Sequence, residues 1–122
     1  MSLAKWWASK NTCPKYIVHC TCDSEVSQEA MFDWWSTSHI FWGAVYSLPL
    51  FFWDNDGLCL AITILAACLF ELFENTKCGR HISGIVCCTK NYAGDNFWNS
   101  FADVICCVVG YGIVLAIKLV ID

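Results

Sequence analysis

Three long apolar runs, separated by short polar segments, dominate this 122-residue chain and limit what it can fold into. They cover residues 36–53, 57–73 and 97–121, and the first contains no Asp, Glu, Lys or Arg. A helix rises 1.5 Å per residue, so runs of this length approach or exceed the hydrocarbon thickness of a bilayer, about 30 Å. Hydrophobic residues make up 57% of the chain, more than a soluble domain of this size can bury. The sequence therefore predicts an all-α, small integral membrane protein with lipid as part of its solvent.

The predicted topology is three transmembrane helices in an up-down-up arrangement. The spans are expected over about residues 36–53, 57–75 and 96–121. The tetrapeptide Asp54–Gly57 favours a tight turn between the first two spans. Residues 36–122 then form one transmembrane domain, and residues 1–35 form an N-terminal interfacial segment without a signal-peptide core. Trp6 and Trp7 suit the lipid headgroup level, where Trp is enriched.

Acidic and amide side chains at the ends of these runs indicate a functional site. Charges in hydrocarbon are costly, so they persist where they face partners inside a bundle or a wet cavity. In an up-down-up arrangement, the start of the first helix, the end of the second and the start of the third share one membrane depth. Helical spacing puts residues 71, 74 and 75 on one face, and residues 96, 99 and 103 on another. The expected polar cluster consists of His39, Glu71, Glu74, Asn75, Asp95, Asn96, Asn99 and Asp103.

Two functions are compatible with such a cluster. The first is binding of a divalent cation or a lipid headgroup. Carboxylates suit Mg²⁺, and an imidazole adds Mn²⁺ or Zn²⁺. The candidate metal ligands are His39, Glu71, Glu74 and Asp103. The alternative is a structural membrane component of a larger assembly, for example a membrane-anchored minor protein of a virion.

The structural alternative rests on the rule that polar groups in lipid must pair with one another. In that interpretation Asn and Asp side chains cap helices and bridge between them, with Asp95 placed to cap the third helix. Gly110 and Gly112 are expected to let helix backbones approach closely. The chain contains no Gly-rich phosphate loop, nucleophile elbow or His-Glu-x-x-His motif, so the sequence identifies no reaction.

Charge gives further expectations about partners and orientation. The formal net charge is −4, with seven basic and eleven acidic residues, which leaves no basic face for nucleic acid. Six of the seven basic residues fall on the N-terminal side of the arrangement, whereas the Asp54–Gly57 turn carries only acids. The positive-inside rule therefore predicts a cytoplasmic N-terminus and a cytoplasmic polar cluster. Three helices bury little surface between them, so we expect self-association or a partner protein within the lipid bilayer.

Ten cysteines make the chain cysteine-rich and leave three interpretations open. Those inside the apolar runs behave as small hydrophobes when reduced. The sequence places these at Cys59, Cys68, Cys106 and Cys107. The other six are compatible with cross-links, metal binding or free thiols. The Cys20-Thr21-Cys22 motif has no second pair at zinc-ribbon spacing.

Four sequence blocks resemble an uncharacterised family of bacterial multi-pass membrane proteins, domain-of-unknown-function family 2585. In chain order they are CTC at 20–22, WWSTSHIFWG at 34–43 with Val45-Tyr46, ELFEN at 71–75 and YAGDNFWNSFAD at 92–103. The resemblance runs from Cys20 to the third apolar span. Since the family has no established activity, it supports the polar cluster without implying a reaction.

The chain departs from the family pattern at several positions. Asp23 stands in place of Gly, Trp42 in place of a second His, and Asn96 in place of Ser. Residues 1–19 stand where the family has an N-terminal membrane span. The resemblance therefore implies that a site needing both histidines would be incomplete here.

Overall fold

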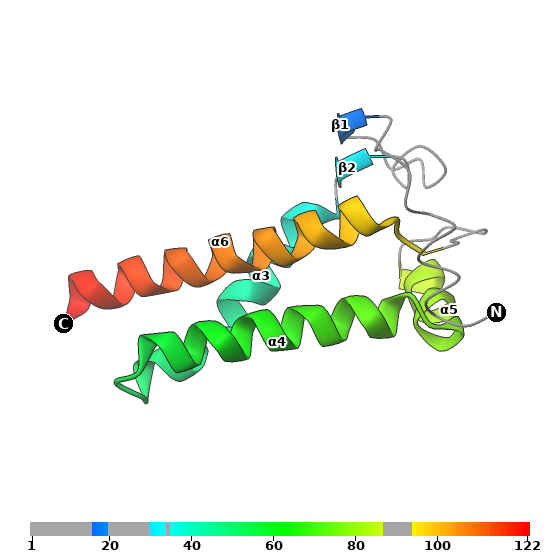
Figure 1. Ribbon diagram of the computed structural model, residues 1–122. Coiled ribbons are helices and arrows are strands. Elements are labelled where there is room, and N and C mark those ends of the chain that lie inside the picture. Colours follow the sequence, from blue (N-terminus) through cyan, green and yellow to red (C-terminus); the bar gives the residue numbers. More distant parts are fainter. Residues whose placement is uncertain (1–15, 20–29, 34, 87–93) are drawn as a thin grey trace.

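A computed structural model describes residues 16–19, 30–33, 35–86 and 94–122 and is mostly helical, as predicted (Figure 1). Its elements are β1 (Tyr16–His19), β2 (Ala30–Asp33), α3 (Ser36–Tyr46), the 3₁₀ helix η1 (Leu48–Phe51), α4 (Asp56–Glu74), α5 (Lys77–Val86) and α6 (Phe97–Ile121). The two short strands pair in parallel, with Tyr16 opposite Ala30 and His19 opposite Asp33. The Cys20–Cys22 motif and most of the predicted interfacial segment lie outside the described residues.

The two longest helices, α4 and α6, run side by side in opposite directions (Figure 1). They contain 19 and 25 residues and are apolar enough to cross a membrane, which confirms the second and third apolar runs as helices. Asn55 caps α4, where its side chain accepts a hydrogen bond from Leu58 N at 2.9 Å. Asn96 caps α6 in the same way, accepting from Asn99 N at 2.9 Å. The prediction that Asp95 provides this cap was therefore wrong by one residue.

The first apolar run does not form one continuous helix, which corrects the predicted span over residues 36–53. The α-helix ends at Tyr46, and Ser47 and η1 follow. Pro49 explains the break, because proline has no N–H to donate and disfavours helical backbone at Leu48 before it. The 11 residues of α3 rise only about 16 Å. Among the described helices, two rather than three have membrane-spanning length.

The polar segment after α4 contains a helix that the sequence analysis did not predict. Thr76 Oγ1 accepts a hydrogen bond from Gly79 N at 3.1 Å and starts α5. A Cβ at Gly79 would lie 2.0 Å from the Phe73 carbonyl oxygen, so the backbone of α5 lies directly on the end of α4. The helix exposes Ile82 and Ile85, three residues apart on one side.

Close backbone packing joins α3 to α6. A Cβ at Gly43 would lie 2.1 Å from the Cys107 carbonyl oxygen, and one at Gly110 would lie 2.1 Å from that of Ile40. The predicted close approach at Gly110 is confirmed, and small residues at this crossing follow the general rule for helices in lipid. A Cβ at Gly112 would meet no atom of another described element within 4 Å, so the same prediction for that residue was wrong.

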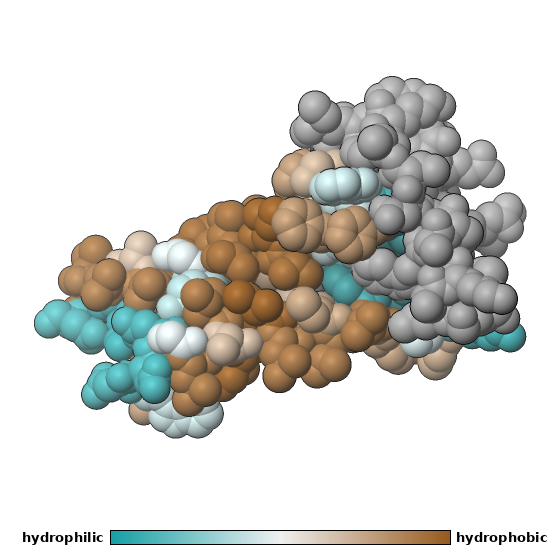
Figure 2. Space-filling view, viewed as in Figure 1, coloured by the Kyte–Doolittle hydropathy of each residue, from teal (hydrophilic) through white to brown (hydrophobic). Residues whose placement is uncertain are grey.

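Large apolar side chains cover much of the outer surface. Figure 2 shows a hydrophobic band over the middle of the helices and hydrophilic surface at the end where α4 begins and α6 ends. At that end, Lys118 Nζ lies 3.7–4.0 Å from the carboxylates of Asp54, Asp56 and Asp122. Only 22% and 28% of the most apolar stretches of α4 and α6 are buried within the chain. Helices so exposed and so apolar are typical of contact with lipid rather than water.

Candidate functional site

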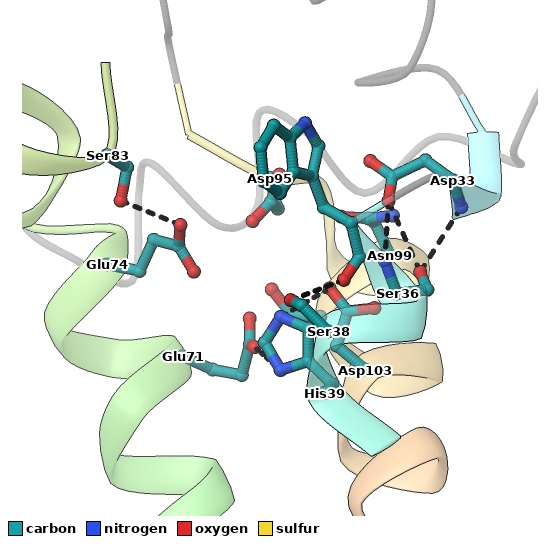
Figure 3. A network of polar contacts seen from close by, with 12 residues as sticks. Asp33, Ser36, Ser38, His39, Glu71, Glu74, Ser83, Asp95, Asn99 and Asp103 are labelled. Carbon is teal, nitrogen blue, oxygen red and sulfur yellow. Dashed lines mark hydrogen bonds and ion pairs between the residues drawn. The ribbon is translucent and has the colours of Figure 1, made fainter. Parts of the chain in front are cut away.

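Three helices bring an imidazole and two carboxylates together in the interior (Figure 3). His39 lies in the first turn of α3, Glu71 near the end of α4 and Asp103 near the start of α6. His39 Nδ1 is 3.6 Å from Glu71 Oε1, and His39 Nε2 is 3.6 Å from Asp103 Oδ2. All three residues are buried, with 3% exposure for both acids. The structure therefore brings these three residues together from segments that are far apart in the sequence.

The two buried carboxylates have unused hydrogen-bonding capacity. Within the described part of the chain, no donor lies within hydrogen-bonding distance of either oxygen of Glu71 or of Oδ1 of Asp103, and the His39 ring comes no closer to Glu71 than 3.6 Å. A buried polar atom without a partner costs about 1–3 kcal/mol, and more when it is charged. A bound cation, or protons, would remove that cost.

Glu74 and Asp95 extend the site on either side of Glu71 (Figure 3). His39, Glu71 and Glu74 form one group whose candidate ligand atoms all lie within 4.8 Å of one another. Glu71, Asp95 and Asp103 form a second group that meets the same limit. Ser83 Oγ of α5 donates to Glu74 Oε1 at 2.7 Å and orients that carboxylate. Each group offers three oxygen or nitrogen ligand atoms, and water would have to complete the coordination of a Mg²⁺ or Mn²⁺ ion.

The amide side chains hold the surrounding helices in place. Asn75 Nδ2 donates to the Glu71 carbonyl at 2.9 Å and to Ser100 Oγ at 3.4 Å. Its Oδ1 accepts from Asp95 N at 2.9 Å, a bond that follows the left-handed backbone of Gly94, whose φ is 86°. Asn99 Nδ2 donates to the Met31 carbonyl at 3.2 Å and so links α6 to β2. Asn75 and Asn99 therefore have structural roles, as Asn96 has in capping α6.

Asp33 is a buried acid near the cluster that the sequence analysis missed. Its Oδ1 accepts from Ser36 N at 2.9 Å, and Ser36 Oγ accepts from Asp33 N at 3.2 Å. This reciprocal pair begins α3 in the manner of a capping box. Burial raises the pKa of the Asp33 carboxyl, although backbone hydrogen bonds from Ser36 and Trp35 lower it. In the sequence, the signal for this pair was the position of Asp33 three residues before Ser36, where the first apolar run begins.

An apolar groove runs beside the cluster, between α4 and α6. Its volume is about 360 Å³, within the usual range for small-molecule sites. Apolar side chains of both helices line it, together with Glu71 and Ser100. The apolar residues include Leu72, Phe97, Phe101 and Val104. Leu72 and Phe101 are also exposed on the outer surface, so the groove borders on the exposed apolar surface.

Trp42, at the position where the resemblance implies a second His, lies outside the cluster. Its side chain is 42% exposed and stacks on Tyr46 with ring centroids 6.2 Å apart. His39 and its carboxylate neighbours come together without a side chain from this position. Cys59, Cys68, Cys78, Cys106 and Cys107 are free thiols, and the other five cysteines lie outside the described residues.

The fold and site define a helical protein with two apolar helices of spanning length and a buried carboxylate–imidazole cluster. The chain belongs to the family described as "Protein of unknown function (DUF2585)", which matches residues 8–122 and confirms the resemblance. It is similar to a UPF0314 protein of Paracoccus denitrificans (strain Pd 1222), with 32% identity over 102 residues. That match covers 81% of this chain and 51% of the relative, so the chain spans about half the length of this curated protein. No solved structure matches the chain.

Proposed function

We propose that this chain is a multi-pass membrane protein that binds a divalent cation in its polar cluster. The observation that carries the proposal is the pair of buried carboxylates, Glu71 and Asp103, with unpartnered oxygens on either side of His39. Such oxygens are costly when empty and favourable as ligands. In lipid this cost is difficult to avoid, since water is scarce.

The donor set favours Mg²⁺ or Mn²⁺ over softer metals. Carboxylate oxygens dominate the cluster, and a single imidazole adds one nitrogen. His39 would bind the cation through Nδ1 and turn its Nε2–H toward Asp103, 3.6 Å away. A carboxylate that holds a metal-binding imidazole from behind in this way fixes the tautomer and the orientation of the ring.

Membrane placement is part of the proposal. The long helices α4 and α6 each cross the bilayer, and α3 with η1 forms a broken first crossing packed against them. Lys77 and Arg80 lie in α5 near the cluster, whereas Lys118 at the other end is surrounded by acids. By the positive-inside rule, the cluster and the N-terminus face the cytoplasm. Reporter fusions at the two termini test this orientation; an N-terminal reporter active only outside the cytoplasm would contradict it.

Cation binding is tested with the full chain purified in detergent micelles. Isothermal titration with Mn²⁺ should give saturable binding that weakens at least tenfold in Glu71→Gln and in Asp103→Asn. Both changes keep side-chain shape and remove charge. Asp54→Asn is the matched control, because Asp54 is an exposed acid at the opposite end. Wild-type affinity in both cluster variants would reject the proposal and leave the cluster as a bridge between helices.

Lipid headgroup binding is a second candidate, favoured by the groove that reaches Glu71. An acyl chain in the groove would bring its headgroup to the edge of the cluster. Leu72→Trp, which fills the groove, should then reduce phosphatidylglycerol retained in native mass spectra. Leu65→Trp serves as control, since Leu65 is exposed on α4 and does not line the groove. Equal lipid retention in the two variants would exclude this candidate.

A further inference from the structure

Glu71 belongs to both groups of candidate metal ligands. One group joins it to His39 and Glu74, and the other joins it to Asp95 and Asp103. The remaining members of the two groups are different residues, so both groups can be filled at once. A carboxylate has two oxygens, and neither oxygen of Glu71 is used by a described donor. The side chain is therefore free to give one oxygen to each group.

Charge balance also favours two cations over one. The two groups contain four carboxylates, from Glu71, Glu74, Asp95 and Asp103, and one imidazole. Three of these acids are buried, and Glu74 is half-buried. When all four carboxylates are ionised, a single divalent cation neutralises half of their negative charge, whereas two cations neutralise all of it. Uncompensated charge in an apolar interior is the most expensive arrangement available.

Hydrogen bonds hold the segments that carry both groups. Ser83 Oγ of α5 donates to Glu74 Oε1 in the first group. Asn75 Oδ1 accepts from Asp95 N and so fixes the backbone that carries the Asp95 carboxylate in the second group. Besides Glu71, the first group draws its ligands from α3 and α4, and the second draws them from α6 and the residues just before it.

We propose that the cluster holds two divalent cations of the Mg²⁺ or Mn²⁺ class, bridged by the carboxylate of Glu71. The inference rests on the cation site of the proposed function and adds its stoichiometry and geometry. The first cation is bound by His39, Glu71 and Glu74, and the second by Glu71, Asp95 and Asp103. Bridged pairs of this kind have ions about 3.5–4 Å apart, close enough for their electron spins to couple.

The experiment counts Mn²⁺ ions per chain and records their electron paramagnetic resonance spectrum. Mn²⁺ is chosen because thiolates bind it poorly, so the ten cysteines contribute little. The wild-type chain should bind two ions with a spin-coupled spectrum. Glu74→Gln and Asp95→Asn should each retain one ion with an uncoupled spectrum. Asp33→Asn is the control, because Asp33 is a buried acid outside both groups, and it should retain the coupled pair.

The possible results distinguish failure of the two-cation inference from failure of the proposed cation-binding function on which it rests. One uncoupled ion in the wild-type chain would overturn the bridged pair and leave a single-cation site standing. No bound ion would overturn both. Two coupled ions in Glu74→Gln or Asp95→Asn would overturn the assignment of ligands and with it the inference. Circular dichroism verifies folding, and the half-buried position of Glu74 makes its variant the less disruptive of the two.

Discussion

Replacing Gly110 with alanine should separate α3 from α6 and weaken the cluster. The added Cβ would lie 2.1 Å from the Ile40 carbonyl oxygen and 2.7 Å from Ala44 N. Ordinary contact begins at 3.4 Å, so the oxygen must retreat by 1.3 Å. Both obstructing atoms are backbone atoms, and no side-chain rotation can relieve the clash.

The expected energy has two opposing parts. Overpacking of this kind costs about 1–3 kcal/mol. Alanine is favoured over glycine in a helix by about 1 kcal/mol, which offsets part of that cost. Gly112→Ala has the same helix preference without the clash, because Gly112 has open space around it. The difference in unfolding free energy between the two variants therefore isolates the steric cost, about 2 kcal/mol.

The same displacement of α3 should also change the geometry of the polar cluster. Ile40 follows His39 directly, and a rigid movement of α3 would lengthen the His39–Asp103 separation from 3.6 Å to as much as about 4.9 Å. Unfolding in mixed detergent micelles, followed by circular dichroism, measures stability, and Mn²⁺ titration measures the site. Gly110→Ala should lower both the stability and the Mn²⁺ affinity, whereas Gly112→Ala should lower neither. Equal behaviour of the two variants would refute the packing argument.

Three further predictions concern single contacts. Asn75→Ala removes the amide that joins the Glu71 carbonyl, Ser100 and Asp95 N, so chemical denaturation should show a loss of about 1–3 kcal/mol, together with weaker Mn²⁺ binding. Tyr111→Phe removes the hydrogen bond to the Asp56 carbonyl far from the site; unfolding should reveal a loss of about 0.5–1.5 kcal/mol while Mn²⁺ affinity stays at the wild-type value. Because carboxylate and imidazole ligands must release protons to bind a metal, Mn²⁺ affinity should fall between pH 7.5 and pH 5.5, and a titration flat across this range would argue against these ligands.

Hydropathy and chain direction predicted that His39, Glu71 and Asp103 lie toward one end of their helices, and the structure brings the three together. Successive apolar runs that reverse direction bring alternate ends to one level, however far apart they are in sequence. This reasoning predicts the level of each residue along the helix axes, but it does not predict how each helix is rotated about its own axis. For α6, the sequence nevertheless indicates which residues share a face of the helix. At 100° per residue, Gly110 lies on nearly the same face of α6 as Asp103, and Gly112 lies on the opposite face.

Other features depended on contacts that hydropathy does not report. Pro49 was visible in the first run, but the run's uniform apolarity concealed the break in the helix. Asp33 lies outside the apolar runs, in a strand whose pairing partner begins at Tyr16. Its burial comes from tertiary packing near α3 rather than from any local pattern. The helix α5 is polar overall and is held by the backbone contact of Gly79 with α4.

The helix α3 carries both the close backbone contact with α6 and the imidazole of the cluster. Gly43 lies one helical turn after His39, so the face that admits the α6 backbone also directs the imidazole toward Asp103. A larger residue at this crossing would hold the helices apart, and the imidazole would then lie too far from the acids to share a cation. The unpartnered carboxylates should in turn destabilise the bundle, and the proposed cation would remove that cost. Close glycine packing offsets the cost, since it brings many backbone atoms of α3 and α6 into contact. The stability of the chain without a cation and its cation affinity should therefore change together at the Gly43–Gly110 crossing. They should change independently at Tyr111, whose hydroxyl bonds to the beginning of α4, far from the site.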